Sequence, residues 1–173
     1  EFKIDGGLWD GRYLYDLYSE AHTPWGWHKP LFEYAKKIGF TIFSSPFDNS
    51  AVDLLEDLDA PAYKIASCEA IDLPLIKYVA QTGKPMIIST GMADFDEIHE
   101  AIEAAHQGGC RELAVLHCVS GYPAPSNNYN LRTIVDMQEK FGLVTGLSDH
   151  TIDNVTAFTS IALGASIIEN VDS

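Results

Sequence analysis

The sequence predicts an α/β protein with a parallel sheet, on three observations. Short apolar runs alternate with stretches of helical periodicity. The runs carry no polar–apolar alternation, as expected for strands covered on both faces. Polar side chains gather at their carboxyl ends, where parallel α/β proteins place their active sites. The runs span residues 40–45, 62–67, 85–90, 113–118, 143–150 and 166–169.

Six helical stretches are expected in strict alternation with these six strands. Gly39 and Gly142 close two of them, and Asp94 with Glu97 forms a capping-box pattern at the start of another. Residues 1–26 have no clean period and are interpreted as a loop or lid segment with one helical stretch, Arg12 to Ala21. The other stretches cover residues 27–38, 51–58, 75–80, 94–105, 131–141 and 155–162.

An open doubly wound sheet and a (β/α)₈ barrel both fit this alternation. No Gly-x-Gly-x-x-Gly follows a strand, which weakens a dinucleotide-binding sheet. Six units are two short of a closed barrel, and the chain begins in a loop. We therefore expect residues 27–173 to form a partial (β/α)₈ TIM barrel that lacks its first two strands.

Composition narrows the classes of partner. The 173 residues are 46% hydrophobic and carry a net charge of −14, which argues against nucleic acid and anionic membrane as partners. No apolar stretch approaches the roughly 18 residues of a membrane span. Cys68, Cys110 and Cys118 fit neither a zinc spacing nor a disulfide framework, so a reducing, cytoplasmic location is expected.

Lys64 is unusual because it lies inside an apolar strand. A lysine on an edge strand that extends its ammonium group to solvent is the ordinary interpretation. A Schiff-base nucleophile or a clamp for an anionic ligand are the functional ones. Ser67, at the end of the same strand, favours the anion clamp because hydroxyl groups help to hold phosphate.

His117 and His150 follow successive strands, so on a barrel they would be neighbours. Each alone is more often a hydrogen-bonded strand-end histidine. Together, beside Ser148 and Asp149, they predict a shared divalent metal ion with positions left open for water and substrate. Ser45, Ser89 and Thr90 also end strands, either as ordinary helix caps or as neutral donors around Lys64.

Several motifs, in chain order, resemble those of the sialic acid synthase family, whose members condense phosphoenolpyruvate with an amino sugar to give nine-carbon acids. The N-terminal stretch resembles the pseudaminic acid synthase branch in particular, through Gly6–Asp10 (GGLWD), Leu14–Tyr18 (LYDLY) and Thr23–Pro24. The motifs shared with the family are Pro61–Ser67 (PAYKIAS), Gly83–Met92 (GKPMIISTGM), Leu116–Cys118 (LHC), Tyr122–Pro125 (YPAP) and Gly146–Thr151 (GLSDHT).

The resemblance implies a (β/α)₈ barrel with Mn²⁺, or another divalent metal, held by His117 and His150. It implies a transferase that forms a carbon–carbon bond from phosphoenolpyruvate and a 2,4-diacetamido-trideoxy hexose. The expected catalytic residues are Lys64, His117, Asp149 and His150. The expected phosphoenolpyruvate-binding residues are Ser45, Lys64, Ser67, Ser89 and Thr90.

The resemblance also has departures. The family's first two strands supply an acidic residue and a second lysine, and a C-terminal antifreeze-like domain caps the partner's site in a homodimer; none of these is expected here. Alternatives are an N-acetylneuraminate or legionaminate synthase, a different phosphoenolpyruvate-condensing or metal-dependent aldolase barrel, or an incomplete barrel that only binds ligand.

Overall fold

The computed structural model describes residues 2–6 and 9–170 and divides the chain into two compact units, residues 1–41 and 42–173. The first unit contains helices α1 (Leu14–Ala21) and α2 (Trp25–Ile38). The helix expected at the end of the N-terminal loop is thus confirmed as α1. Gly39 ends α2 in the left-handed conformation with φ of 77°, as the glycine signal predicts.

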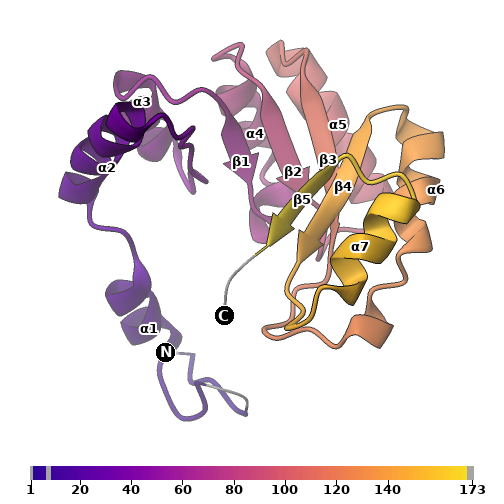
Figure 1. The fold of residues 1–173 in the computed structure, drawn as a ribbon. Helices are drawn as coiled ribbons and strands as arrows, with labels where there is room; N and C mark the ends of the chain where they lie inside the picture. The colour runs from indigo at the N-terminus through magenta and orange to yellow at the C-terminus, as the bar shows by residue number, and fades with distance from the viewer. Residues whose placement is uncertain (1, 7–8, 171–173) are drawn as a thin grey trace. The chain divides into compact units, whose positions relative to one another are not determined.

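The second unit carries one parallel sheet, in which five strands are found among the described residues (Figure 1). The strands lie in chain order, and each pairs only with its neighbours in the sequence. Each connection between two paired strands therefore crosses over through a helix. They are β1 (Tyr63–Ile65), β2 (Met86–Ser89), β3 (Leu113–Cys118), β4 (Val144–Asp149) and β5 (Ile167–Asn170).

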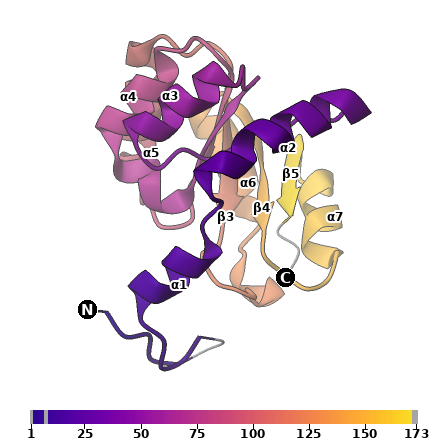
Figure 2. The ribbon, with the colours of Figure 1, turned by 90° about the vertical axis from the view of Figure 1, so that its left-hand side faces the viewer.

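Helices alternate with these strands, as the periodicity predicts. Figure 2 shows α7 beside β5 at one edge of the sheet, with α4 and α5 toward the other. Asp94 and Glu97 form the expected capping box at the start of α5. The helices of this unit are α3 (Asn49–Asp57), α4 (Leu73–Ala80), α5 (Phe95–Gly108), α6 (Arg132–Phe141) and α7 (Val155–Ala162), with short 3₁₀ turns at Ser67–Ile71 and Ser126–Asn128.

The strand expected at residues 40–45 does not form. Ser44 makes one parallel bridge to Tyr63, and the amide of Lys64 donates to the carbonyl of Ser44 over 3.3 Å. Phe40 and Phe43 remain exposed. A single bridge is too short for a ladder, because a strand requires successive residues to pair with a neighbour.

The sheet is strongly curved, and one ion pair demonstrates it. In a flat sheet, the edge strands β1 and β5 would lie about 19 Å apart, four times the usual strand spacing. Lys64 of β1 nevertheless reaches Glu169 of β5, with Nζ 3.4 Å from Oε2. The five strands therefore form a half-barrel, whose concave face brings residues of its two edges together, and the expected partial (β/α)₈ barrel is confirmed.

Packing buries most residues of β1 to β4, whereas β5 is only partly buried. Tyr63, Ile65 and Val115 have no solvent exposure. At Gly146 the neighbouring strand approaches so closely that an added Cβ would lie 2.2 Å from the carbonyl oxygen of Ile167. None of the helices in the described ranges is both long and apolar enough to cross a membrane.

Candidate active site

Strand register sorts the predicted residues onto the two faces of the half-barrel. Cys118 is in register with Ser148, and Ser148 with Glu169, so these three side chains share a face. The Lys64–Glu169 ion pair shows that this is the concave face. Ser89 lies on it too, since Lys64 is in register with Ile87, two residues before Ser89. Among the described strand residues, the concave face therefore gathers the ammonium group of Lys64, the carboxylate of Glu169 and the hydroxyl groups of Ser89 and Ser148.

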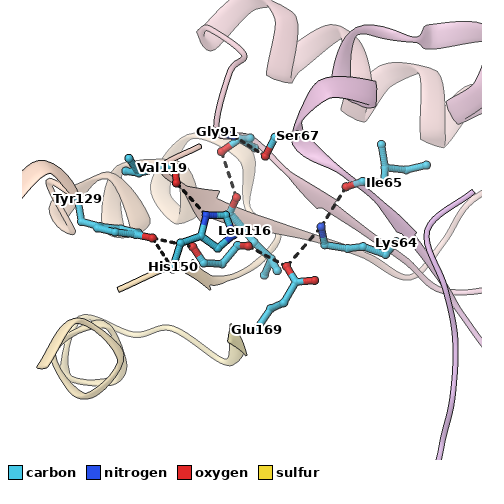
Figure 3. Close-up of polar contacts among 11 residues, drawn as sticks. Lys64, Ile65, Ser67, Gly91, Leu116, Val119, Tyr129, His150 and Glu169 are labelled. Carbon is cyan, nitrogen blue, oxygen red and sulfur yellow. Dashed lines mark hydrogen bonds and ion pairs between the residues drawn. The ribbon is translucent and has the colours of Figure 1, made fainter. Parts of the chain in front are cut away.

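Lys64 is buried, with 6% of its surface exposed, so its ammonium group does not extend to solvent. Besides the pair with Glu169, its Nζ donates to the carbonyl of Ile65 over 3.3 Å (Figure 3). A buried ammonium needs such partners because isolated burial of a charge is costly. An anionic ligand on this face would find a positive charge already desolvated.

The hydroxyl groups differ in what they already bind. Ser148 Oγ donates to Glu169 Oε2 over 2.8 Å, and Ser67 Oγ accepts from the amide of Gly91 over 3.1 Å. Ser89 is 2% exposed, and its Oγ has no hydrogen-bond partner within the described part of the chain. A buried hydroxyl without a partner is costly unless something binds it, so Ser89 is a ready ligand donor.

Of the two remaining predicted hydroxyl residues, Thr90 already has a partner within the protein. Thr90 Oγ1 donates to the carbonyl of Leu116 over 3.1 Å, which ties β2 to β3. Ser45 is half-buried and follows Ser44, the residue that makes the single bridge to Tyr63.

His117 does not share the concave face. It is in register with Leu147, which packs with Ala124, Tyr129 and Ile134 beneath the helices. Its Nε2–H donates to the carbonyl of Tyr129. Burial lowers the pKa of His117, with the hydrogen bond to that carbonyl acting in the opposite direction. The register thus gives no support to the expectation that His117 and His150 hold one ion together.

Asp149 is also on the helix-covered side, because it alternates with Ser148. It is fully buried, and its Oδ1 accepts the amide of Thr151 over 3.0 Å. This geometry shapes the turn after β4. It does not bring Asp149 to the residues around Lys64, where a catalytic carboxylate would be useful.

His150 follows β4 and is the next residue after Ser148 in the alternation. It is 7% exposed, its Nδ1–H donates to the carbonyl of Val119 over 3.0 Å, and its ring stacks on Tyr122 with centroids 4.2 Å apart. Donation from Nδ1 leaves Nε2 as the nitrogen with an available lone pair. A backbone carbonyl that orients the opposite nitrogen is the usual environment of a metal-binding imidazole.

His150 can offer one ring nitrogen, Nε2, to a divalent ion. Among residues 2–6 and 9–170, no group of three or more His, Cys, Asp or Glu side chains is placed to hold a metal. One imidazole leaves the remaining coordination positions to water and substrate oxygens. Oxygen-rich coordination is what Mn²⁺ prefers.

Two carboxylates on this side of the molecule were not assigned a role from the sequence. Glu169 pairs with Lys64, as described above. Glu69 is half-buried in the turn after Ser67, and its Oε2 has no partner among the residues described. Burial raises the pKa of Glu69; nearby Asp72 adds to the rise, and Lys64 opposes it. The sequence shows Glu69 just after one apolar run and Glu169 at the end of another, but it does not show that Glu169 pairs with Lys64 across the sheet.

The arrangement is suited to binding an anion next to an acid. A ligand phosphate or carboxylate could replace Glu169 as the counter-ion of Lys64. Ser67, Ser89 and Ser148 would supply neutral donors. Glu69, with its raised pKa, is a candidate proton donor or acceptor.

The chain is similar in sequence and fold to several known proteins. The chain is 46% identical to pseudaminic acid synthase of Helicobacter pylori over 97% of its own length and 49% of that protein, so it spans about half the length of this curated relative. It matches the crystal structure of spore coat polysaccharide biosynthesis protein SpsE from Bacillus subtilis with a TM-score of 0.81 and 36% identity, over 91% of this chain and 45% of that one.

A second solved structure is also similar. N-acetylneuraminic acid synthetase from Leptospira borgpetersenii, determined in complex with citrate, matches with a TM-score of 0.84 and 30% identity, over 89% of this chain and 54% of that one. The NeuB family model covers residues 1–170. Fold, motifs and sequence thus lead to one assignment: the chain belongs to the NeuB family.

Proposed function

We propose that this chain carries the phosphoenolpyruvate-binding side of a sialic-type acid synthase. The reaction is the condensation of phosphoenolpyruvate with a 2,4-diacetamido-trideoxy hexose of the pseudaminic acid type. The observation that supports it most directly is the buried Lys64 on the concave face, paired with Glu169. Ser89 lies on the same face, and its hydroxyl has no partner among the described residues.

The proposed chemistry forms one carbon–carbon bond and breaks one carbon–oxygen bond. The methylene carbon of phosphoenolpyruvate attacks the aldehyde carbon of the open-chain sugar, and the aldehyde oxygen takes up a proton. Water adds to the second carbon of the former phosphoenolpyruvate and loses a proton. Phosphate then leaves with the bridging oxygen, which gives a nine-carbon 2-keto acid.

The chain's own residues bind and orient in this scheme. Lys64 balances the charge of the phosphate or carboxylate, and Ser67 and Ser89 donate hydrogen bonds to its oxygens. Burial of Lys64 strengthens this attraction, because the site excludes much of the solvent that would screen it. Glu69 moves the proton that the aldehyde oxygen or the attacking water requires.

A divalent ion, Mn²⁺ on the resemblance, would bind at Nε2 of His150 and act as a Lewis acid on the aldehyde oxygen. His150 itself supplies a neutral imidazole whose orientation is fixed by the Val119 carbonyl. The complete protein is proposed to act as a homodimer.

The pseudaminic-type sugar is favoured over other amino sugars by two observations. The chain is 46% identical to the pseudaminic acid synthase and 30% identical to the N-acetylneuraminic acid synthetase. Its N-terminal GGLWD stretch, residues 6–10, resembles the same branch. N-acetylneuraminate and legionaminate synthesis, or ligand binding without turnover, are the alternatives.

The proposal is tested by calorimetric titration of phosphoenolpyruvate into the 173-residue chain. Lys64→Gln should weaken binding at least about tenfold, because a hydrogen bond to a charged group contributes about 1.5–3 kcal/mol. Lys84→Gln is the matched control, since Lys84 also pairs with a glutamate, Glu56, over 2.8 Å but precedes β2 at its amino end. Lack of binding by the parent, or an equal loss in both variants, would contradict the proposed site.

Substrate choice is tested by phosphate release from phosphoenolpyruvate in the presence of single sugars. Release with a 2,4-diacetamido-trideoxy hexose supports the proposed reaction. Release with N-acetylmannosamine indicates the neuraminate alternative. Release with sugar phosphates alone would indicate a different aldolase-type barrel.

A further inference from the structure

His150 makes four contacts with one segment, the β3–α6 loop (residues 119–131). Its backbone amide donates to Tyr129 Oη over 2.7 Å, and its carbonyl accepts the amide of Ala124 over 2.9 Å. Its Nδ1–H donates to the carbonyl of Val119 over 3.0 Å, and Tyr122 stacks on its ring. The loop that follows the neighbouring strand β3 therefore orients both the backbone and the imidazole of His150.

Tyr129 is the buried anchor of this loop. It has no solvent exposure, and its ring packs in a cluster with Ala124, Ile134 and Leu147. Its hydroxyl accepts the amide of His150 (Figure 3). The same hydroxyl donates to the carbonyl of Ser148 over 3.4 Å. One phenol thus contacts the residues on both sides of Asp149. Burial raises the pKa of Tyr129 to about 12, so the hydroxyl keeps its proton near neutral pH.

His117 secures the other end of Tyr129. Its Nε2–H donates to the Tyr129 carbonyl, so the residue is held at its backbone by β3 and at its hydroxyl by β4. This explains why a histidine occurs at the end of β3 although it lies away from the concave face. The contacts form a continuous connection from His117 through Tyr129 to His150.

We propose that Tyr129 is a positioning residue that sets the orientation and tautomer of His150 through the β3–α6 loop. The hydroxyl fixes the His150 backbone, which keeps Nδ1–H on the Val119 carbonyl and directs Nε2 to the ligand. This role depends on the proposed function only for the identity of the ligand that Nε2 of His150 binds. The tautomer itself is a property of the metal-free chain.

The test replaces Tyr129 by Phe and compares it with Tyr63→Phe. Tyr63 is equally buried, and its hydroxyl donates to Glu56 over 2.6 Å, outside this loop. Both changes remove one buried hydroxyl, so the control accounts for lost stability alone. The first readout is the ring-nitrogen shifts of His150 in long-range ¹H–¹⁵N spectra of the metal-free chain, assigned through His150→Gln.

The parent should show the Nδ1–H tautomer. In Tyr129→Phe the two ring-nitrogen shifts should converge as the tautomers exchange, whereas Tyr63→Phe should match the parent. The second readout is Mn²⁺ affinity by electron paramagnetic resonance. It should fall about tenfold in Tyr129→Phe, the lower end of the effect of removing groups that orient metal ligands, and stay unchanged in Tyr63→Phe.

Unchanged ring shifts in a folded Tyr129→Phe would overturn the positioning role. If that variant does not fold, the parent decides, because an Nε2–H tautomer of His150 would overturn it equally. A parent with the Nδ1–H tautomer that binds no Mn²⁺ would refute the proposed metal and leave the positioning role standing.

Discussion

At the scale of single residues, the candidate site contains charges that are only partly balanced. Lys64 is nearly buried and meets Glu169, while Glu69 keeps one oxygen without a partner among the described residues. Such groups are expected at functional sites, because stability alone would favour their replacement by uncharged side chains. The titration of Glu69, whose pKa is raised by burial, should therefore be visible in the stability of the chain.

Glu69→Gln should reveal that titration. The folded-state pKa of Glu69 is raised above its ordinary value of 4.5, mainly by burial. A carboxyl group of this kind favours the folded state below pH 4.5, and this contribution is lost as pH rises through the raised pKa. The Gln variant lacks this loss, so its stability relative to the parent should increase upward from pH 4.5 and then level off.

The measurement is the urea midpoint of parent and variant between pH 4.5 and 8. Glu100→Gln, at an exposed position of α5, controls for the removal of one negative charge from an acidic chain. A stability difference for Glu69→Gln that is constant with pH, or that shrinks as pH rises, would contradict the burial of this carboxyl.

At the scale of elements, the sheet depends on close approach between β4 and β5. A Cβ on Gly146 would lie 2.2 Å from the Ile167 carbonyl oxygen and 2.7 Å from Leu116 Cδ2. Gly146→Ala should therefore displace β5 and reduce the free energy of unfolding by about 3 kcal/mol, the upper part of the range for overpacking. Because β5 carries Glu169, the ion pair with Lys64 should be lost as well.

Gly121→Ala is the control, since its Cβ would meet only ordinary contacts, 3.7 Å or more from its nearest neighbours. It should change the unfolding free energy by less than about 1 kcal/mol. Denaturant titration of both variants gives the comparison. Equal effects would show that the β4–β5 spacing adapts, contrary to the structure.

The positions of the helices and strands were largely predictable from the sequence. The face of the sheet toward which each strand residue points was not. The period of the apolar residues located five strands and their helices, and the Asp94–Glu97 capping box marked a helix start correctly. Residues 40–45 form an apolar run like the five that became strands, but they make only one bridge to a neighbouring strand. Pairing with a neighbour, which periodicity does not encode, decides whether an apolar run becomes a strand.

The residues of the candidate site likewise could be located along the chain from the sequence, but not assigned to a face of the sheet. Lys64 and Ser89 lie on the concave face. His117 and Asp149 are at strand ends too, yet register turns both toward the helices. A shift of one residue exchanges the faces of a strand, so position along the chain alone could not separate His117 from His150. The Lys64–Glu169 pair joins opposite sheet edges and depends on curvature.

At the scale of the whole molecule, the net charge of −14 opposes the approach of an anionic substrate. The attraction at Lys64 is short-ranged and buried, so salt screens it weakly, whereas the repulsion from exposed carboxylates is screened over about 10 Å at 0.1 M salt. The association rate of phosphoenolpyruvate should therefore rise as ionic strength increases from about 0.02 to 0.2 M, opposite to the behaviour of a protein with a basic surface. Stopped-flow fluorescence of the chain's tryptophans gives the rate, and potassium and choline chlorides compared at equal ionic strength separate screening from specific ion binding. A rate that falls with both salts would mean that local positive charge governs the encounter, and the concave face would then have to be more basic than Lys64 alone makes it.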